Sequence, residues 1–174
     1  MKESLSKIKK EILSCKKCPL WKKRKNAVPG EGPKNAKIMF IGEAPGKNED
    51  ATGRPFVGRA GKFLNYLLEK NGIKRKNVFI TSVLKCVTNK PNFKFIEICK
   101  EYTFRQIEAI NPKKIVLLGN FAIGTFLGKK IKVSQIHGKI IKYGNRILIP
   151  TFHPAAGMRF KKIGKLMEED FKKI

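Results

Sequence analysis

The segment KIMFIGEAPG, residues 37–46, decides the fold, because a short apolar run leads directly into a loop that contains glycine and proline. Short apolar runs bounded by turn residues are typical of buried strands. Three further runs of this kind follow, at residues 78–84, 115–119 and 147–152. The sequence therefore predicts four strands that form the core of the molecule.

Helical patterns lie between and around the predicted strands. They fall at residues 1–13, 62–71 and 94–110, in a short stretch that ends at Leu127, and in a basic tail at 161–173. Strands that alternate with helices indicate an α/β fold, in which a mainly parallel four-stranded sheet carries helices on both faces. Because no repeat, linker or low-complexity segment interrupts residues 1–174, we expect one domain.

In an open parallel sheet the functional site lies at the carboxyl ends of the strands. Three special segments fall there: Gly42–Gly46, Thr81–Cys86 and Thr151–Ala156. Gly42–Gly46 lets backbone amides approach a ligand closely, although it matches neither a P-loop nor a dinucleotide-binding motif. A plain turn between a strand and a helix has the same composition, so the convergence of three segments is the stronger signal.

Two segments near these strand ends carry side chains suited to chemistry. The segment GRPFVGRAG, residues 53–61, places Phe56 between Arg54 and Arg59. An aromatic ring can stack on a base while arginines meet phosphates, or the ring can simply pack in the core. His153, just past the last predicted strand, can donate a hydrogen bond to a developing negative charge or act as an acid or base, although a lone histidine is often structural.

The chain has four cysteines, Cys15, Cys18, Cys86 and Cys99. The N-terminal residues are polar and lack the apolar region of a secretory signal, so we expect a cytoplasmic protein whose thiols stay reduced. A Cys-x-x-Cys pair with two further cysteines then indicates four thiolate ligands, which suit an iron–sulfur cluster or a zinc ion. A set of buried cysteines without a metal is the alternative.

Basic residues outnumber acidic ones along the whole chain. The 39 Lys and Arg residues against 13 Asp and Glu give a net charge of +26. This excess favours a polyanionic partner, and nucleic acid is the expected one. No apolar run is long enough to span a membrane and no segment resembles a basic amphipathic anchor, so we expect no membrane partner.

These motifs, in this order, resemble the iron–sulfur uracil-DNA glycosylases of family four. The matching pieces run from Cys15 to the C-terminus: CKKC, GEAPGKNED, GRPFVGRAG, NVFITSVLKC, KKIVLLGNFA and PTFHPAA. Each piece is short, but their order and spacing are specific. The resemblance implies a three-layer α/β/α glycosylase fold and a structural [4Fe–4S] cluster held by Cys15, Cys18, Cys86 and Cys99.

The resemblance also implies roles for the residues of the pocket. Glu43 and Ala44 would line the O2 side of the base and the sugar, largely through backbone groups, with Gly42 beside them as a substrate-binding residue. Phe56 would stack on the flipped uracil. His153 would hydrogen-bond O2 as negative charge builds on the leaving base.

Water activation and DNA contacts complete the site that the resemblance implies. Glu49 would place the attacking water or balance the cationic sugar, because Ala44 cannot activate water as the acid or amide of other glycosylase families does. DNA contacts would come from Arg54, Arg59 and a wedge loop with Met158 and Arg159. The lysines are expected at the surface and none stands out as a nucleophile, so we expect a monofunctional enzyme that leaves an abasic site.

Two features depart from the family pattern. Ser82 stands where the family usually has Asn, which reads the O4 and N3 edge of uracil. A hydroxyl has one rotating O–H, whereas an amide offers an acceptor and a donor together. Either uracil discrimination weakens or shifts toward hypoxanthine or xanthine, or serine substitutes with activity retained. The twelve residues between Cys86 and Cys99 are also fewer than the family leads us to expect.

Three functions are weighed on this basis. The first is a DNA-repair glycosylase that excises uracil or a related deaminated base. The second is a non-catalytic iron–sulfur DNA-binding module with the same fold, which lost base excision through changes such as Ser82. The third is a zinc protein that binds RNA. We expect a monomer, and a sliding clamp is considered as a partner without a motif that supports it.

Overall fold

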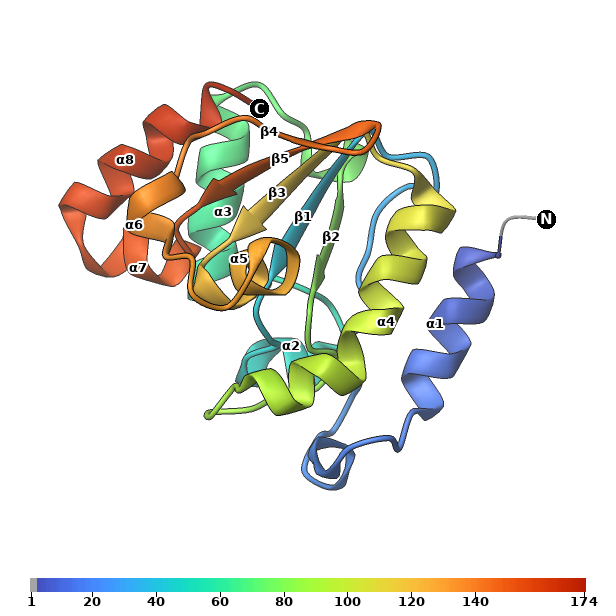
Figure 1. The fold of residues 1–174 in the computed structure, drawn as a ribbon. Coiled ribbons are helices and arrows are strands. Elements are labelled where there is room, and N and C mark those ends of the chain that lie inside the picture. Colours follow the sequence, from blue (N-terminus) through green and yellow to red (C-terminus); the bar gives the residue numbers. More distant parts are fainter. Residues whose placement is uncertain (1–2) are drawn as a thin grey trace.

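The computed structural model describes residues 3–174, in which a sheet lies between two layers of helices (Figure 1). The strand order is β2-β1-β3-β5-β4. The strand bounds are Ile38–Gly42 (β1), Phe79–Ser82 (β2), Lys114–Leu118 (β3), Ile141–Tyr143 (β4) and Arg146–Thr151 (β5). The first four strands in this order pair in parallel and β4 is antiparallel to β5, so the predicted mainly parallel α/β sheet is confirmed.

The helices agree with most of the predicted segments. They are α1 (Leu5–Ser14), α2 (Lys47–Thr52), α3 (Arg59–Lys70), α4 (Phe93–Ile110), α5 (Asn120–Leu127), α6 (Val133–Ile136), α7 (Pro154–Arg159) and α8 (Lys161–Phe171), with 3-10 turns η1 (Pro19–Lys22) and η2 (Arg75–Asn77). Residues 1 and 2, which begin the predicted helix at 1–13, lie outside the described residues.

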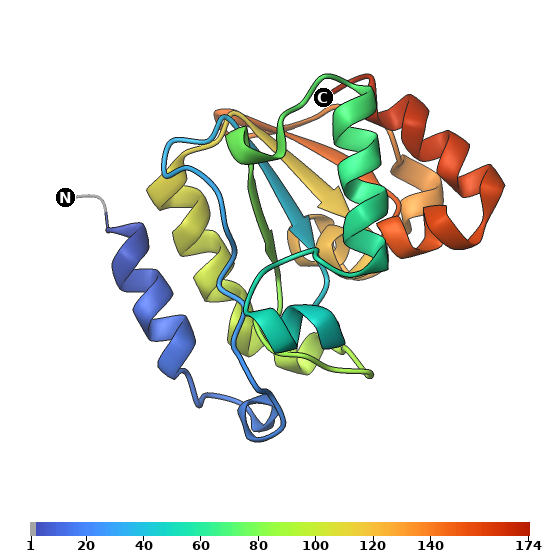
Figure 2. The ribbon, with the colours of Figure 1, turned by 180° about the vertical axis from the view of Figure 1, so that it is seen from behind.

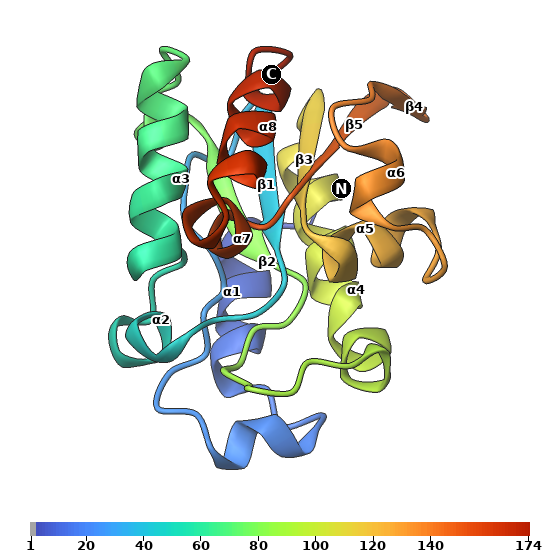
Figure 3. The ribbon, with the colours of Figure 1, turned by 90° about the vertical axis from the view of Figure 1, so that its left-hand side faces the viewer.

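Alternate residues of β1 separate the two halves of the core. Met39 and Ile41 pack in one cluster with side chains of α1, α4 and α5, whereas Phe40 packs in the other with side chains of α3 and α8. This alternation is what a strand buried on both faces requires. Figures 2 and 3 show the resulting layers, with α3 and α8 on one face, α4 and α5 on the other, and α1 outside α4.

The prediction of four strands is wrong by one. The additional strand β4 has three residues and forms a hairpin with β5, in which Tyr143 pairs with Arg146 across a tight turn. Gly144 has a φ of 59° in this turn, a conformation that glycine adopts without steric cost. Helix α2 is also additional, because no helix was predicted between the first strand and residue 62.

The carboxyl ends of the parallel strands form one edge of the sheet. Figure 1 shows α2, α7 and η1 toward this edge, and the hairpin of β4 and β5 toward the opposite one. Gly42, Ser82 and Thr151 end β1, β2 and β5 there. None of the helices within residues 3–174 has the length and apolar character needed to cross a membrane.

Candidate functional site

A cavity of about 130 Å³ lies where the carboxyl ends of β1, β2 and β5 meet. Its lining residues are Val28, Ala44, Pro45, Gly46, Glu49, Pro55, Phe56, Ala60, Ser82 and His153. The fold therefore brings together five of the predicted site residues, from four separate segments of the chain: Ala44, Glu49, Phe56, Ser82 and His153.

Phe56 belongs both to the core and to the cavity wall. Its side chain is 7% exposed and packs in the cluster that contains Leu64. Its ring also faces the cavity, with its centroid 5.8 Å from that of His153. The two interpretations offered by the sequence are thus compatible, because the core fixes a ring that still presents one surface to a ligand.

Gly42 and Glu43 lie next to the cavity and are not among its lining residues. A Cβ atom at Gly42 would lie 2.5 Å from Cζ of Phe56 and 3.2 Å from Oγ of Ser82, so glycine allows both side chains to approach the strand. The half-buried Glu43 carboxyl has a pKa raised by burial. The Glu43 carbonyl accepts a hydrogen bond of 3.0 Å from the Leu84 amide, which fixes the loop after β1 to the loop after β2.

Glu49 joins two walls of the cavity through its carboxylate. One oxygen accepts hydrogen bonds of 2.8 Å from the amides of Val57 and Gly58, and the other accepts one of 3.0 Å from the amide of Gly46. Three backbone donors hold this side chain in one place. The site thus contains a fixed carboxylate beside the cavity.

His153 is held in one tautomer by the start of α7. Its Nδ1 accepts a hydrogen bond of 3.2 Å from the Ala155 amide, so Nε2 carries the proton of the neutral ring. Burial lowers the pKa of His153 to about 4, and the nearby charge of Glu49 opposes this shift. At neutral pH the ring is therefore an uncharged hydrogen-bond donor, which suits an oxygen that gains negative charge during a reaction.

The predicted DNA-binding residues lie on exposed parts of the structure. Arg54 is exposed and its guanidinium pairs with Glu31 at 2.9 Å, while Arg59 is the first residue of α3. Met158, at 43% exposed, is one of the few exposed large apolar side chains. The guanidinium of Arg159 lies 5.6 Å from the ring centroid of Phe160, which is also exposed. Met158 and Arg159 were expected in a loop, but they end helix α7, because Pro154 and the His153 cap begin a helix directly after β5. This helix presents apolar and basic side chains to solvent.

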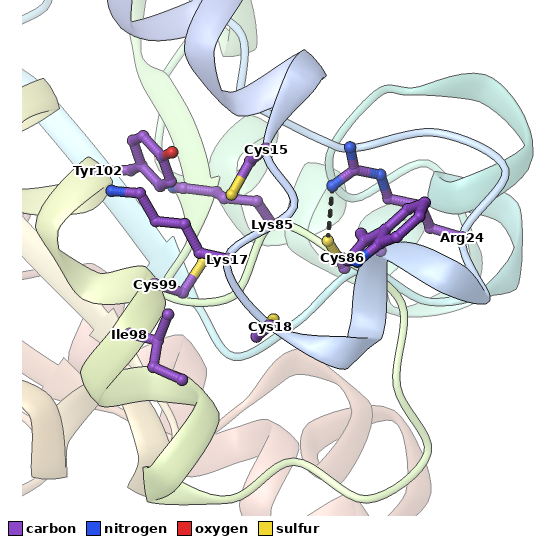
Figure 4. A pocket seen from close by; sticks show the side chains of 10 residues that line it. Cys15, Lys17, Cys18, Arg24, Lys85, Cys86, Ile98, Cys99 and Tyr102 are labelled. Atoms are coloured by element: carbon purple, nitrogen blue, oxygen red, sulfur yellow. Dashed lines mark hydrogen bonds between the residues drawn. The ribbon is translucent and has the colours of Figure 1, made fainter.

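A second cavity brings the four cysteines together. It is lined by Cys15, Lys17, Cys18, Trp21, Arg24, Lys85, Cys86, Ile98, Cys99 and Tyr102. Figure 4 shows the four sulfur atoms arranged around one space, although the cysteines come from the end of α1, the start of η1, the loop after β2, and α4. Within residues 3–174, no three His, Cys, Asp or Glu side chains are close enough to hold a single metal ion.

Three basic side chains line this cavity, and sequence reasoning missed all of them. Arg24 donates a hydrogen bond of 3.1 Å to Sγ of Cys86 and another of 2.9 Å to the carbonyl of Leu13. Burial raises the pKa of the Cys99 thiol to about 11, and the positive charge of Lys85 opposes this shift. The cysteines therefore face a positively charged surrounding.

Lys85 contradicts the expectation that the lysines lie at the surface. Its side chain is buried, and Nζ donates hydrogen bonds to Oγ1 of Thr81 (2.7 Å), the carbonyl of Ser82 (2.7 Å) and Oε1 of Gln106 (2.9 Å). Burial lowers the pKa of Lys85 to about 7, but three accepting oxygens require the three N–H groups of the ammonium form. Only its position directly before Cys86 hinted at this burial.

The comparisons with known proteins identify the family. The model of the "Uracil DNA glycosylase superfamily" matches residues 29–174. A type-4 uracil-DNA glycosylase of Sulfurisphaera tokodaii is 47% identical, over 99% of this chain and 84% of its own length. A type-4 uracil-DNA glycosylase of Archaeoglobus fulgidus is 43% identical, over 99% of this chain and 92% of its own length.

A type-5 relative is less similar to this chain than the type-4 proteins are. A type-5 uracil-DNA glycosylase of Thermus thermophilus is 28% identical, over 90% of this chain and 79% of its own length. The type-4 proteins are thus more similar over more of the chain. Together with the cavity at the strand ends, these matches show that the chain belongs to the uracil DNA glycosylase superfamily and, within it, to the type-4 uracil-DNA glycosylases.

Proposed function

We propose that this chain is a monofunctional DNA-repair glycosylase that excises uracil from DNA and leaves an abasic site. The type-4 relatives carry this activity in their names. The observation that carries the proposal is the cavity that places a stacking ring (Phe56), a neutral donor (His153) and a fixed carboxylate (Glu49) around one ligand-sized space.

In this proposal each of these groups takes part in one step. A flipped uracil enters the cavity and stacks on Phe56. As the bond between C1′ and N1 breaks, its electron pair moves to the base, and Nε2–H of His153 donates to the O2 that gains charge. The carboxylate of Glu49 balances the cationic sugar and positions the water that adds to C1′. Ala44 has no group that activates this water, so stabilisation of the leaving base is the main contribution.

Ser82 reads the edge of the base in this proposal. It is buried, its side chain lines the cavity, and its carbonyl is held by Lys85 at 2.7 Å. The hydroxyl forms one hydrogen bond to the O4 or N3 edge where an amide would form two. We therefore expect uracil excision with weaker discrimination than an asparagine at this position gives.

We propose that Cys15, Cys18, Cys86 and Cys99, which line the second cavity, hold a [4Fe–4S] cluster. The ligand type is right, because four thiolates suit such a cluster. A single zinc ion fits less well, since it needs its ligands about 2.3 Å away and no three candidate side chains of residues 3–174 approach one point. When bound, the cluster supplies a cross-link between the N-terminal segment and the body of the protein.

Charge supports the same assignment. Lys85 is a buried ammonium whose three bonds go to uncharged oxygens. A buried charge without a counter-ion is costly. A group with four thiolates carries a net negative charge and would compensate both Lys85 and Arg24, which donates to Cys86.

Base excision on a matched set of labelled oligonucleotides tests the function. The set carries uracil opposite G, uracil opposite A, single-stranded uracil, hypoxanthine and xanthine, and alkali cleavage reveals abasic sites. Ser82→Asn is the paired variant. Release of uracil, with strand cleavage only after alkali and a faster rate for Ser82→Asn, is expected.

The other outcomes distinguish the alternatives. Excision of purine bases alone would show that Ser82 resets the specificity. No excision by protein that retains its iron, as judged by visible absorbance and iron content, would overturn the enzyme and favour a DNA-binding module. A colourless protein that contains zinc would overturn the cluster.

A further inference from the structure

Phe56 has a backbone conformation that phenylalanine rarely adopts. Its φ is 49°, in the left-handed region, and within residues 3–174 only Asn111 shares this feature among residues other than glycine. For a bulky side chain this conformation is unfavourable, so surrounding contacts must impose it. Gly61 permits part of this arrangement, because a Cβ atom there would lie 1.9 Å from the carbonyl oxygen of Phe56.

Arg75 holds the backbone on both sides of the Phe56 Cα atom. Its guanidinium donates a hydrogen bond of 2.7 Å to the carbonyl of Pro55 and one of 3.3 Å to the carbonyl of Phe56. Arg75 begins η2, which lies beyond the end of α3, so the contact connects two segments that are separated by a whole helix. Such a contact cannot be read from the local sequence.

The carboxylate of Glu49 holds the next two amides of the same turn. It accepts hydrogen bonds of 2.8 Å from the amides of Val57 and Gly58. The peptide group between Phe56 and Val57 is thus bound at its carbonyl by a cation and at its amide by an anion. Phe56 carries this peptide group, and its ring lines the cavity.

Arg75 is itself fixed in place. It donates a hydrogen bond of 3.0 Å to Oε1 of Glu31 and one of 2.8 Å to Oδ1 of Asn65. Its side chain is 24% exposed. The backbone of Glu31 pairs with that of Ile80, a residue of β2, through hydrogen bonds of 3.0 and 2.8 Å. Four of the five N–H groups of Arg75 are therefore used within the protein, which leaves little capacity to bind a phosphate.

We propose that Arg75 is a positioning residue that sets the Phe56 ring for stacking on the extrahelical base. It acts through the carbonyls of Pro55 and Phe56, and it contacts neither the base nor the DNA backbone. The inference rests on the proposed function. Lysine keeps the charge of arginine but lacks its planar fork, so Arg75→Lys separates geometry from charge.

The test combines Arg75→Lys with Phe56→Ala in a double-mutant cycle. Single-turnover release of uracil from a duplex with uracil opposite G is measured for the parent chain, both single variants and the double variant. Arg146→Lys is the matched control, since Arg146 is also a largely buried arginine but lies at the opposite edge of the sheet. Melting temperature and iron content are recorded for every variant.

We expect Arg75→Lys to slow release by roughly 10- to 100-fold, as misplaced binding groups do. In the Phe56→Ala background the same change should cause no further loss, because the ring through which it acts is absent. Arg146→Lys should release uracil at the parent rate. Equal fold-losses from Arg75→Lys in both backgrounds, or no loss in either, would overturn the proposal.

A second measurement tests the positioning without any reaction. Amide hydrogen exchange at Val57 and Gly58 reports on the same turn in the free protein. Arg75→Lys should accelerate it and Arg146→Lys should not. If the parent chain releases no uracil, the proposed function fails while this measurement still decides the role of Arg75; unchanged exchange would refute that role.

Discussion

At the scale of single residues, the site depends on a histidine that stays uncharged. The Ala155 amide occupies Nδ1 of His153, and burial disfavours the protonated ring. Both features leave Nε2–H as the donor throughout the neutral range. A charged imidazolium would transfer its proton too readily and would repel the cationic sugar.

The protonation of His153 can be measured directly by NMR. The chain has two histidines, so a His153→Gln variant identifies its resonances in a pH titration. We expect a midpoint at about 4, with the neutral Nε2–H form above it. Because this pKa is lowered, the ring becomes charged only as pH falls through that value. A midpoint near the ordinary value of about 6.5 would contradict the account.

Gly42 is expected to tolerate no side chain. In Gly42→Ala the new methyl group would meet the Phe56 ring at 2.5 Å, so the ring must move. Overpacking of this kind costs about 1–3 kcal/mol of unfolding free energy, and uracil release should fall with it. The Phe56→Ala background provides the control, since Gly42→Ala should cause no further loss of melting temperature there. A Gly42→Ala protein with parent stability and activity would contradict the arrangement.

Part of the site was predictable from the sequence and part was not. Ser82 and His153 belong to segments at the ends of predicted strands, which converge in a parallel sheet, so their meeting was expected. Phe56 was assigned to the pocket by the family resemblance. Lys85 and Arg75 were not foreseen, because their roles depend on hydrogen bonds to distant backbone groups. In a chain with 39 basic residues, no local signal distinguishes a buried lysine or arginine from an exposed one.

At the scale of elements, the cysteine cavity connects the N-terminal segment to the sheet. Helix α1 packs against α4, and Arg105 pairs with Glu3 and Glu11 across that contact. Arg24 and Lys85 add contacts on either side of the cysteines. Lys85 lines the cysteine cavity and donates a hydrogen bond to the carbonyl of Ser82, which lines the first cavity. One side chain therefore connects the two cavities.

Lys85→Met should therefore destabilise the protein. Methionine has a similar length but removes the shorter hydrogen bond to the oxygens of Ser82 and Gln106, at a cost of roughly 1–3 kcal/mol. These oxygens keep only the longer bonds from Thr103 (3.3 Å) and Thr81 (3.4 Å). The loss of positive charge should also lower iron retention during dialysis against a chelator. Lys130→Met, at an exposed position, is the control for charge alone. Equal melting temperatures and iron contents in the two variants would refute this role.

The elements themselves were largely predictable. Apolar runs gave the parallel strands because burial on both faces demands continuous hydrophobicity. β4 was not predicted, because Ile141–Tyr143 has too few residues to show an alternation of apolar and polar side chains. Its pairing with β5 also depends on the turn at Gly144. α2 was not predicted, because it is stabilised by the carboxylate of Glu49 and not by an apolar face. This carboxylate accepts hydrogen bonds from the amide of Gly46 before the helix and from the amide of Val57.

At the scale of the whole molecule, the net charge of +26 governs association with DNA. The logarithm of the DNA-binding constant should fall linearly with the logarithm of the salt concentration, because phosphate contacts release counterions. Arg159→Gln, in exposed α7 beside the pocket, should reduce the slope by about 1. Arg146→Gln, at the opposite edge of the sheet, should leave it unchanged. Equal slopes for both variants would show that α7 does not contact DNA.

The central claim is that this cavity releases uracil through a neutral donor on His153. The most direct measurement is the single-turnover rate of uracil release from a duplex with uracil opposite G, for the iron-loaded parent chain and for His153→Gln. The account predicts release by the parent chain and a rate lower by roughly 10²- to 10³-fold for the variant. No release by the parent chain, or equal rates for the two proteins, would contradict it.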